Sequence, residues 1–411
     1  MLKDGEFELS TVAIAGTFDS KGPEFLYVKQ LFEAMGIKTL TIHTGVFEPY
    51  FKPDISNVAV MKADGKNLKE IAQKKDRALA TAALAKGMEK IVRKLYDEGR
   101  FDGIISLGGS GGTAMVTPAM RGLPIGVPKI MVSTMASGNV EKYVGTSDII
   151  MMPSIVDVAG LNSLSKTIFN NAVYAMAGML EHKRPIAKET KPLVAATMFG
   201  VTTPCVDYAK AYLEKRGYEV LVFHCTGTGG KTMESLIKSG FFKGVLDLTT
   251  TEWCDEVVGG DLKAGEERCE AAAKCGIPQV VSVGALDMVN FGPIDTIDPK
   301  FKGRNFYPHN PMVTLMRTTT DECVQIAEKL AEKWNMAEHG KITLVLPLKG
   351  LSMIDSVGQP FYGPEEDKAL YDTLKLKLDR NIVEIIEMDE NINNPKLAEF
   401  AAQKLIDMME K

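Results

Sequence analysis

The sequence predicts an α/β protein of two duplicated, Rossmann-like domains, each a doubly wound and mainly parallel sheet. Short apolar runs alternate along the chain with longer segments of helical periodicity, which is typical of strands joined by crossover helices. The chain has 411 residues, more than one ordinary hydrophobic core accommodates. The order of its apolar runs also begins again near residue 192. These observations together favour two copies of one α/β domain.

Each predicted element of the first copy follows from its local pattern. Apolar runs of strand length end in glycine or polar residues, whereas the segments between them place apolar residues three and four positions apart. In the first predicted helix, Phe25, Val28 and Phe32 share one face in this way. The expected order is strand 11–16, helix 22–36, strand 38–45, helix 66–99 and strand 101–109.

The second copy aligns with the first without a gap, residues 192–224 on residues 11–43. In that register Pro204 meets Pro23, and His224 meets His43. The charged, proline-bearing segment 182–192 is the expected join, so the predicted domains are residues 1–186 and 187–411. Two further strand–helix pairs are expected in the second copy: strand 341–350, a helix from Glu365, strand 382–389 and a helix from Pro395.

Composition excludes several classes of partner. The net charge is −5 and the basic residues are scattered, which argues against nucleic acid. No apolar run approaches the length of a membrane span, and residues 1–10 lack the apolar core of a secretion signal. The cysteines lack metal-site spacing and indicate reduced thiols of a cytoplasmic protein. They are Cys205, Cys225, Cys254, Cys269, Cys275 and Cys323.

A glycine-rich turn, GGSGGT, follows the strand that ends near residue 108. Two interpretations stay open for it. It is a tight strand-to-helix turn without a ligand, or a loop whose bare backbone N–H groups approach a phosphate at a helix start. Its spacing is neither that of a P-loop nor that of a dinucleotide fingerprint. The candidate residues are Gly108, Gly109, Ser110, Gly111, Gly112 and Thr113.

Loops after other strands of the same sheet carry residues suited to phosphate and Mg²⁺. In GTFDSKG, hydroxyls, a carboxylate and an ammonium precede a predicted helix, with Asp19 as the candidate metal ligand. The alternative is that Asp19 or Ser20 caps this helix and Lys21 is solvated. Because these loops converge at one edge of a parallel sheet, a polyphosphate site is predicted there. Its further candidate residues are Gly16, Thr17, Ser20, Lys21, Thr44, Gly45, Ser133, Thr134, Gly138 and Thr146.

The corresponding strand ends of the second copy are acidic. Carboxylates with His309 could hold a divalent metal or perform acid–base chemistry, and equally could be helix caps and surface ion pairs. His43, at a strand end, is more often a neutral imidazole that satisfies a loop carbonyl than a catalytic group. The catalytic candidates are His43, Glu252, Asp287, His309 and Lys349.

Several long motifs resemble the Tm-one-like ATP-binding family, long described as uncharacterised, which includes the N-terminal domain of the tobamovirus resistance protein. They include AGTFDSKGPE, SLGGSGGTA, VGTSDIIMMPSIVDVAGLN and HNPMVTLMRTT, and the similarity spans nearly the whole chain. The resemblance implies ATP bound by the first domain, Mg²⁺ dependence and self-association as dimers or higher homo-oligomers. Its ATP site carries over to residues 16–22, 43–45, 108–113 and 133–139.

Three functional hypotheses follow. The first is an ATP- and Mg²⁺-dependent enzyme that acts on an unknown small molecule in a cleft between the domains. The second is a non-catalytic ATP-sensing module or scaffold. The third is a metal-dependent hydrolase or lyase whose site lies in the second domain. The residues do not decide whether ATP is consumed.

Overall fold

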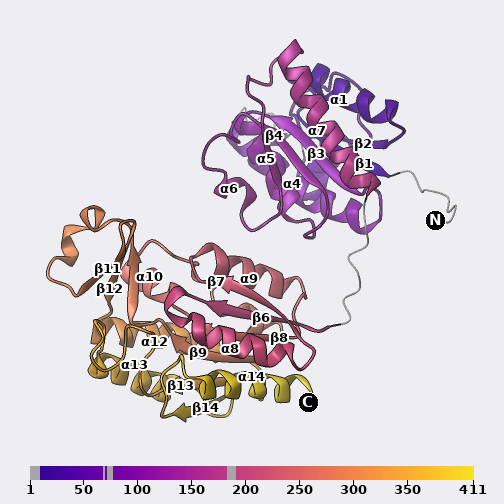
Figure 1. Ribbon diagram of the computed structural model, residues 1–411. Helices are drawn as coiled ribbons and strands as arrows, with labels where there is room; N and C mark the ends of the chain where they lie inside the picture. The colour runs from indigo at the N-terminus through magenta and orange to yellow at the C-terminus, as the bar shows by residue number, and fades with distance from the viewer. Residues whose placement is uncertain (1–9, 68–69, 72–76, 183–190) are drawn as a thin grey trace. The chain divides into compact units, whose positions relative to one another are not determined.

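The computed structural model describes residues 10–67, 70–71, 77–182 and 191–411. The chain divides into two compact units, Met1–Ala187 and Lys188–Lys411 (Figure 1). The polar N-terminal residues 1–9, much of the predicted join at 182–192 and part of the predicted helix 66–99 lie outside the described residues.

The first unit is built on a parallel sheet with strand order β2-β1-β3-β4-β5 among its described residues. Its strands are β1 Thr11–Gly16, β2 Lys38–His43, β3 Gly103–Gly108, β4 Lys129–Ser133 and β5 Ile150–Pro153. Its helices are α1 Gly22–Ala34, α2 Asn57–Ala63, α4 Arg77–Asp97, α5 Ser110–Arg121, α6 Glu141–Val144 and α7 Ser163–Glu181.

Helices cover both faces of this first sheet. Successive side chains of β1 alternate between the faces: Ile14 packs in the hydrophobic cluster with α1 and α7, and Ala13 packs in the cluster with α4 and α5. Burial on both faces explains why the strands read as nearly continuous apolar runs. The α/β, mainly parallel fold class predicted from the sequence is therefore confirmed here.

The second unit has a parallel sheet of order β14-β13-β9-β8-β6-β7 among its described residues. The strands are β6 Leu193–Met198, β7 Glu219–His224, β8 Gly244–Thr249, β9 Gln279–Gly284, β13 Ile342–Pro347 and β14 Val383–Met388. The helices are η1 Gly200–Thr202, α8 Thr203–Glu214, α9 Thr228–Lys238, α10 Glu252–Val258, α11 Ala271–Lys274, η2 Ile294–Thr296, η3 Pro299–Phe301, α12 Thr320–Trp334, α13 Pro364–Lys377 and α14 Pro395–Met409.

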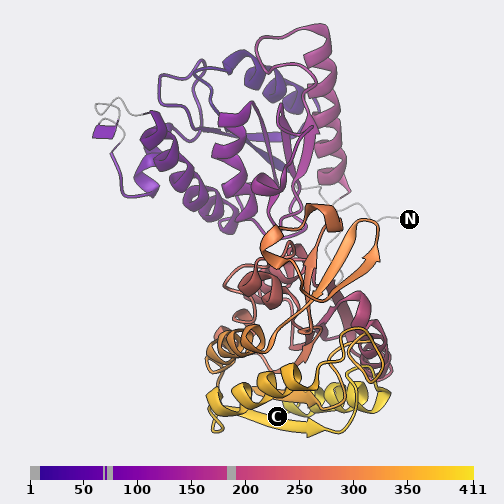
Figure 2. The ribbon, with the colours of Figure 1, turned by 90° about the vertical axis from the view of Figure 1, so that its left-hand side faces the viewer.

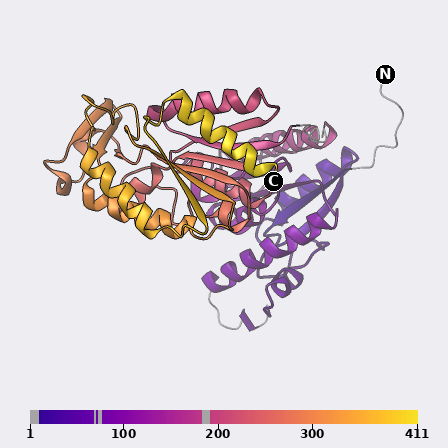
Figure 3. The same cartoon turned by 90° about the horizontal axis from the view of Figure 1, so that it is seen from below.

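Packing in the second unit follows the same rule. Residues of α8 and α14 share one hydrophobic cluster on β6, and the two helices lie side by side (Figure 3). Met233 and Ile237 of α9 pack against the opposite face. The two additional strand–helix pairs predicted near the C-terminus are present as β13, α13, β14 and α14.

A small antiparallel sheet in the second unit was not predicted. Its order is β10-β12-β11, with β10 Met288–Phe291, β11 Phe306–Asn310 and β12 Val313–Arg317. The hairpin of β11 and β12, drawn in orange, extends beyond the six-stranded sheet (Figures 1 and 2). No strand was predicted for residues 303–311, and Pro308 lies within β11, where proline is uncommon.

The first four strands of each sheet follow the same order, β2-β1-β3-β4 and β7-β6-β8-β9. In both sheets the direction of winding therefore reverses beside the first strand. In open α/β sheets the crevice outside the carboxyl ends of the strands at this reversal is the usual place for a ligand. The loops after β1 and β3 lie there in the first unit, and those after β6 and β8 in the second.

Candidate functional site

The carboxyl edge of the first sheet brings most of the predicted nucleotide loops together. The loops after β1 and β2 are joined because the N–H of Thr44 donates to the carbonyl of Gly16 at 2.8 Å. The loops after β3 and β4 are joined in the same way, Thr134 N to Gly108 O at 3.3 Å. Because β1 and β3 are neighbours, GTFDSKG and GGSGGT follow adjacent strands at the reversal of strand order.

Neither conformation nor packing explains Gly109 and Gly111 of the GGSGGT turn, whereas a Cβ on Gly108 would lie 3.2 Å from the Cα of Gly112. Gly109 is the N-cap of α5, and none of the glycines at 108, 109, 111 and 112 has a positive φ. A Cβ on Gly109 would approach the hydroxyl of Thr134 no closer than 3.7 Å, and one on Gly111 would meet no atom of the described residues within 4 Å. Glycine here costs about 0.5–1 kcal/mol relative to alanine. The open space above Gly111 is what a ligand in contact with the backbone requires.

The buried hydroxyls of two predicted residues, Thr113 and Ser133, stabilise the turn by hydrogen bonds. The Thr113 Oγ1 donates to the carbonyl of Gly109 at 2.8 Å and lies 2.6 Å from Ser133 Oγ. Ser133 Oγ also accepts the N–H of Met135 at 3.0 Å. Both side chains are fully buried. Thr113 and Ser133 therefore shape the turn, while Ser110, Thr134 and Gly138 are exposed.

Asp19 combines one satisfied and one unsatisfied carboxylate oxygen. Its Oδ2 accepts the N–H of Phe47 at 3.0 Å, and its Oδ1 is buried without a hydrogen-bond partner among the described residues. A Cβ on Gly45 would lie 2.2 Å from Oδ1, so that glycine is required for the carboxylate to lie here. An unsatisfied buried carboxylate oxygen is suited to a hard cation such as Mg²⁺.

The capping alternative for this loop is not what the structure shows. Lys21 occupies the N-cap of α1 and makes no side-chain capping bond. Ser20 Oγ donates instead to Thr17 Oγ1 at 2.9 Å. The Lys21 ammonium donates to the carbonyl of Val158, so it is partly buried against the loop after β5.

His43 is a structural residue of the same edge. It is fully buried, and its Nδ1 accepts the N–H groups of Phe18 at 3.2 Å and Gly45 at 3.3 Å. Its Nε2 must therefore carry the proton, and it donates to the carbonyl of Phe47 at 3.0 Å. Both ring nitrogens are occupied, which supports the structural interpretation over the catalytic one.

Thr146 does not belong with the other candidate residues. The short helix α6 carries the chain back toward the amino edge of the sheet before Thr146. Gly145 lies against Arg121 at the end of α5, and Asp148 binds the ammonium of Lys129 at the start of β4. The glycine and hydroxyl pattern of residues 145–148 contained no signal of this reversal.

Glu252 in the second unit belongs to a buried ion-pair cluster. Arg268 forms a bidentate pair with Asp247 at 2.5 and 2.7 Å, and its Nε donates to Glu252 at 2.7 Å. The other Glu252 oxygen accepts the N–H groups of Gly227 at 2.8 Å and Gly230 at 3.1 Å. Burial raises the pKa of Glu252 and Arg268 opposes that rise. This carboxylate is satisfied by the protein itself.

Asp287 lies in a second buried cluster that sequence reasoning found only in part. Ser352 Oγ donates to Asp287 Oδ2 at 2.8 Å, and the other Asp287 oxygen has no hydrogen-bond partner among the described residues. Arg317 donates to Asp367 at 2.7 Å, and Asp355 lies 3.9 Å from the same guanidinium. Burial, with repulsion from Asp355, raises the pKa of Asp287 to about 7 and that of Asp367 to about 8.

The remaining candidates of the second unit lie elsewhere. Lys349 is exposed and pairs with Asp389 at 2.8 Å. His309 is exposed on β11, opposite the far part of β12, roughly 10 Å along the strand from Arg317 at about 3.3 Å per residue. In the part of the chain that the structure describes, no group of three or more His, Cys, Asp and Glu side chains is arranged to hold a metal ion.

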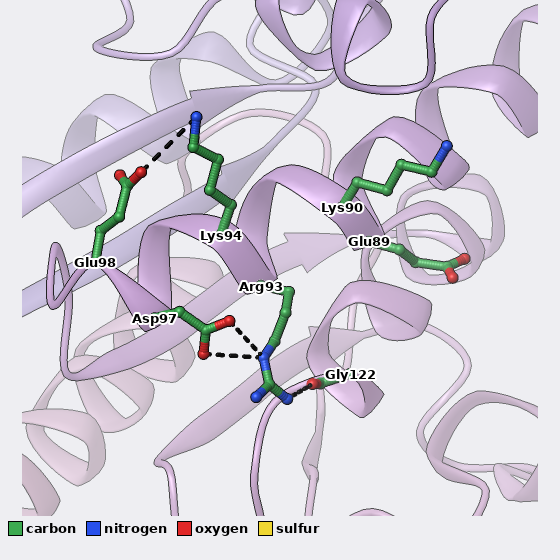
Figure 4. Close-up of a pocket in the computed structure, with 7 residues that line it drawn as sticks. All are labelled: Glu89, Lys90, Arg93, Lys94, Asp97, Glu98 and Gly122. Carbon is green, nitrogen blue, oxygen red and sulfur yellow. Dashed lines mark hydrogen bonds and ion pairs between the residues drawn. The ribbon is translucent and has the colours of Figure 1, made fainter.

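A charged hollow of about 680 Å³ lies over α4, away from the predicted residues (Figure 4). Arg93 pairs with Asp97 at 3.0 Å and Lys94 lies 3.7 Å from Glu98, so these four charges form i,i+4 pairs along the helix, and Lys90 pairs with Asp64 at 2.6 Å. Such a surface is typical of a solvated helix face.

The geometry defines the class first: a two-unit, doubly wound α/β protein whose first unit gathers glycine-rich loops at its carboxyl edge. Comparison with known proteins then shows the family. Residues 10–185 match the N-terminal domain of the uncharacterised protein family UPF0261, and residues 191–409 match its C-terminal domain. The chain belongs to this family.

Relatives agree with the family resemblance drawn from the motifs and confirm it. A UPF0261 protein of Clostridium tetani (strain Massachusetts / E88) is 53% identical over 401 residues, 97% of this chain and 99% of that protein. The ToMV resistance protein Tm-1 of Solanum lycopersicum is 45% identical over 341 residues, 82% of this chain and 45% of that protein.

Solved structures resemble this chain distantly. A UDP-GlcNAc 2-epimerase from Neisseria meningitidis bound to UDP-GlcNAc is 10% identical, with a TM-score of 0.25, over 66% of this chain and 82% of that one. The corresponding enzyme of Methanocaldococcus jannaschii has a TM-score of 0.24 at 10% identity, over 66% of this chain and 83% of that one.

Among the described residues, no helix is both long and apolar enough to cross a membrane.

Proposed function

We propose that the first unit binds ATP with Mg²⁺ at the carboxyl edge of its sheet, between the GTFDSKG and GGSGGT loops. The observation that carries the proposal is the open space above Gly111, where a Cβ would meet no described atom within 4 Å and φ is not positive, so the protein itself needs no glycine there. Backbone N–H groups at the start of α5 suit a phosphate because the helix end is electropositive and its first amides lack helical acceptors.

The residues of this edge also fit Mg²⁺. Mg²⁺ is commonly held by one or two carboxylates together with substrate phosphates, and Asp19 Oδ1 is a buried carboxylate oxygen without a partner among the described residues. The bound ion would neutralise phosphate charge. The Lys21 ammonium, held by the carbonyl of Val158, adds a second positive charge at the same edge.

Binding is better supported than chemistry. Both ring nitrogens of His43 form hydrogen bonds within the protein, and the hydroxyls of Thr113 and Ser133 form a hydrogen bond with each other. The enzyme hypothesis stays a prediction, tested by incubating the protein with ATP and Mg²⁺ across a metabolite pool and measuring ADP and AMP. Self-association also stays a prediction, and light scattering with and without ATP tests it.

The decisive experiment is a Gly111→Ala variant, with ATP affinity measured by isothermal titration calorimetry in Mg²⁺. We expect the affinity for ATP to fall tenfold to a hundredfold, because the added methyl group would separate the phosphates from the backbone N–H groups. Each hydrogen bond to a charged group contributes about 1.5–3 kcal/mol to the free energy of binding. Gly178→Ala is the matched control, because Gly178 also lies in a helix with no described atom within 4 Å of a Cβ. Unchanged ATP affinity in a folded Gly111→Ala protein would refute the proposal.

A further inference from the structure

Phe47 lies in the loop that follows β2, and hydrogen bonds from neighbouring segments fix the position of its backbone. The Phe47 N–H donates to Asp19 Oδ2 at 3.0 Å. Its carbonyl accepts from His43 Nε2 at 3.0 Å and, more weakly, from Asn57 Nδ2 at 3.5 Å. Both groups that engage it most closely belong to the candidate nucleotide edge. The position of Phe47 is therefore set by the same residues that shape the proposed site.

The side chain of Phe47 is nevertheless left in solvent, with 76% of the residue exposed. Phe51 of the same loop stacks on Phe18, with ring centroids 4.7 Å apart, so the loop does bury an aromatic side chain when it turns inward. A phenyl ring left exposed loses the stabilisation that burial of its apolar surface would supply. A backbone held in place with its ring facing solvent is suited to an aromatic contact with a ligand.

Two buried polar atoms at the ends of β1 and β2 also lack partners among the described residues. They are Asp19 Oδ1 and the hydroxyl of Thr44, a residue with no exposed surface. Asp19 binds the Phe47 N–H directly, and Thr44 is three positions before Phe47. Buried polar groups are nearly always hydrogen-bonded in native proteins. Their absence of partners here points to a ligand that supplies them.

The position of the loop fits the far end of a nucleotide. β2 is next to β1, and β1 is next to β3, so the loop after β2 is two strand spacings, about 10 Å, from the GGSGGT turn. A nucleotide whose phosphates lie between the loops after β1 and β3 extends its sugar and base away from them. On the β2 side that direction leads to Phe47.

We propose that Phe47 is the stacking surface for the base of the bound nucleotide. The inference rests on the proposed ATP site, and it assigns Phe47 a role in base recognition that is separate from phosphate binding. Flat, π-faced rings are favourable partners for an exposed phenyl ring, and stacking on a nucleobase accounts for roughly tenfold in affinity.

The test compares ATP with inorganic tripolyphosphate, which carries the phosphates without a base. Affinities of the full chain for both ligands are measured by calorimetry in Mg²⁺, for the natural protein and for Phe47→Ala and Phe47→Trp. We expect Phe47→Ala to bind ATP about tenfold more weakly than the natural protein, with its affinity for tripolyphosphate unchanged. Phe47→Trp, which keeps an aromatic ring, should bind ATP as the natural protein does. Tyr174→Ala, an exposed aromatic on α7, is the control and leaves both affinities unchanged.

The outcomes separate this inference from the proposed function. If Gly111→Ala weakens both ligands while Phe47→Ala leaves ATP binding unchanged, the stacking role is refuted and the ATP site stands. Equal losses for ATP and tripolyphosphate in Phe47→Ala would also refute stacking, because the residue would then act by shaping the phosphate loops. If the natural protein binds neither ligand, the proposed function fails and the stacking role fails with it.

Discussion

The carboxyl edges of the two sheets satisfy their polar groups in opposite ways. In the second unit, the first amides of α9 donate to Glu252, and a Cβ on Gly230 would lie 2.2 Å from that carboxylate. In the first unit, the space above Gly111 at the start of α5 is open. One helix start is thus filled by the protein's own anion and the other is not. The same strand order supports either a closed edge or one available to an external anion.

The largest effect is expected when the internal anion is removed. Glu252→Ala leaves Arg268 Nε and the amides of Gly227 and Gly230 without their buried acceptor. Breaking a buried ion pair costs about 3–5 kcal/mol, so the free energy of unfolding measured in urea should fall by that amount. Lys368→Ala, in an exposed pair with Asp372, is the control and should change stability by at most about 0.5 kcal/mol. An equally small change in Glu252→Ala would remove the contrast between the two edges.

The second edge should also lose stability as pH rises. Asp367 has a folded pKa of about 8 against an ordinary value of 3.8, so between about pH 4 and pH 8 the folded protein keeps a proton that the unfolded chain has released. Stability that is complete below pH 4 therefore falls as pH rises toward 8, by up to about 1.4 kcal/mol per pH unit for this group.

The Asp367→Asn variant checks that assignment. Its amide oxygen still accepts from Arg317, and it cannot release a proton. We expect urea unfolding across pH 5 to 8 to depend less on pH in the variant than in the natural protein. Identical pH dependence in both proteins would show that Asp367 does not hold the proton.

At the carboxyl edge of the first sheet, Gly16 is required by packing, unlike Gly111. A Cβ at Gly16 would lie 2.0 Å from the ring of Phe25, so Gly16→Ala must displace a fully buried side chain. Overpacking of this kind costs about 1–3 kcal/mol, to be measured by thermal unfolding. A stability equal to that of the natural protein would contradict the packing described for β1 and α1.

The smallest effect is expected at Gly111, and it has the opposite sign. Gly111→Ala should raise stability by about 0.5–1 kcal/mol because alanine is the better helix former and its Cβ meets no described atom within 4 Å. Gain in thermal stability together with loss of ATP affinity is the combination that a ligand-contact glycine predicts. A loss of stability would instead indicate that the glycine is needed by the fold.

Much of the fold could be predicted because its signals are local. The predicted strand 11–16 coincides with β1, and the predicted helix 22–36 ends two residues beyond α1. The antiparallel β10-β12-β11 sheet was missed because its strands are short, because Pro308 lies within β11, and because their pairing is decided by packing against the rest of the unit.

The candidate sites were predicted less evenly. The loops after β1, β2, β3 and β4 converge because the carboxyl ends of parallel strands must share an edge. Thr146 was misplaced because no local pattern shows that α6 reverses the chain. Asp355 and Asp367 were missed because their partner Arg317 is distant in sequence, 50 residues from Asp367.

The alternation of strands and helices, the family, and the two chemically different sets of strand ends could all be read from the amino-acid sequence. These properties depend on periodicity and residue type, which can be read along the chain. Tertiary structure alone decided that Glu252 is an internal counterion, that His43 is a loop support and that the space above Gly111 is open. Ion pairing, hydrogen bonding and burial act over a few ångströms between segments far apart in the chain, so they exist only once the chain has folded.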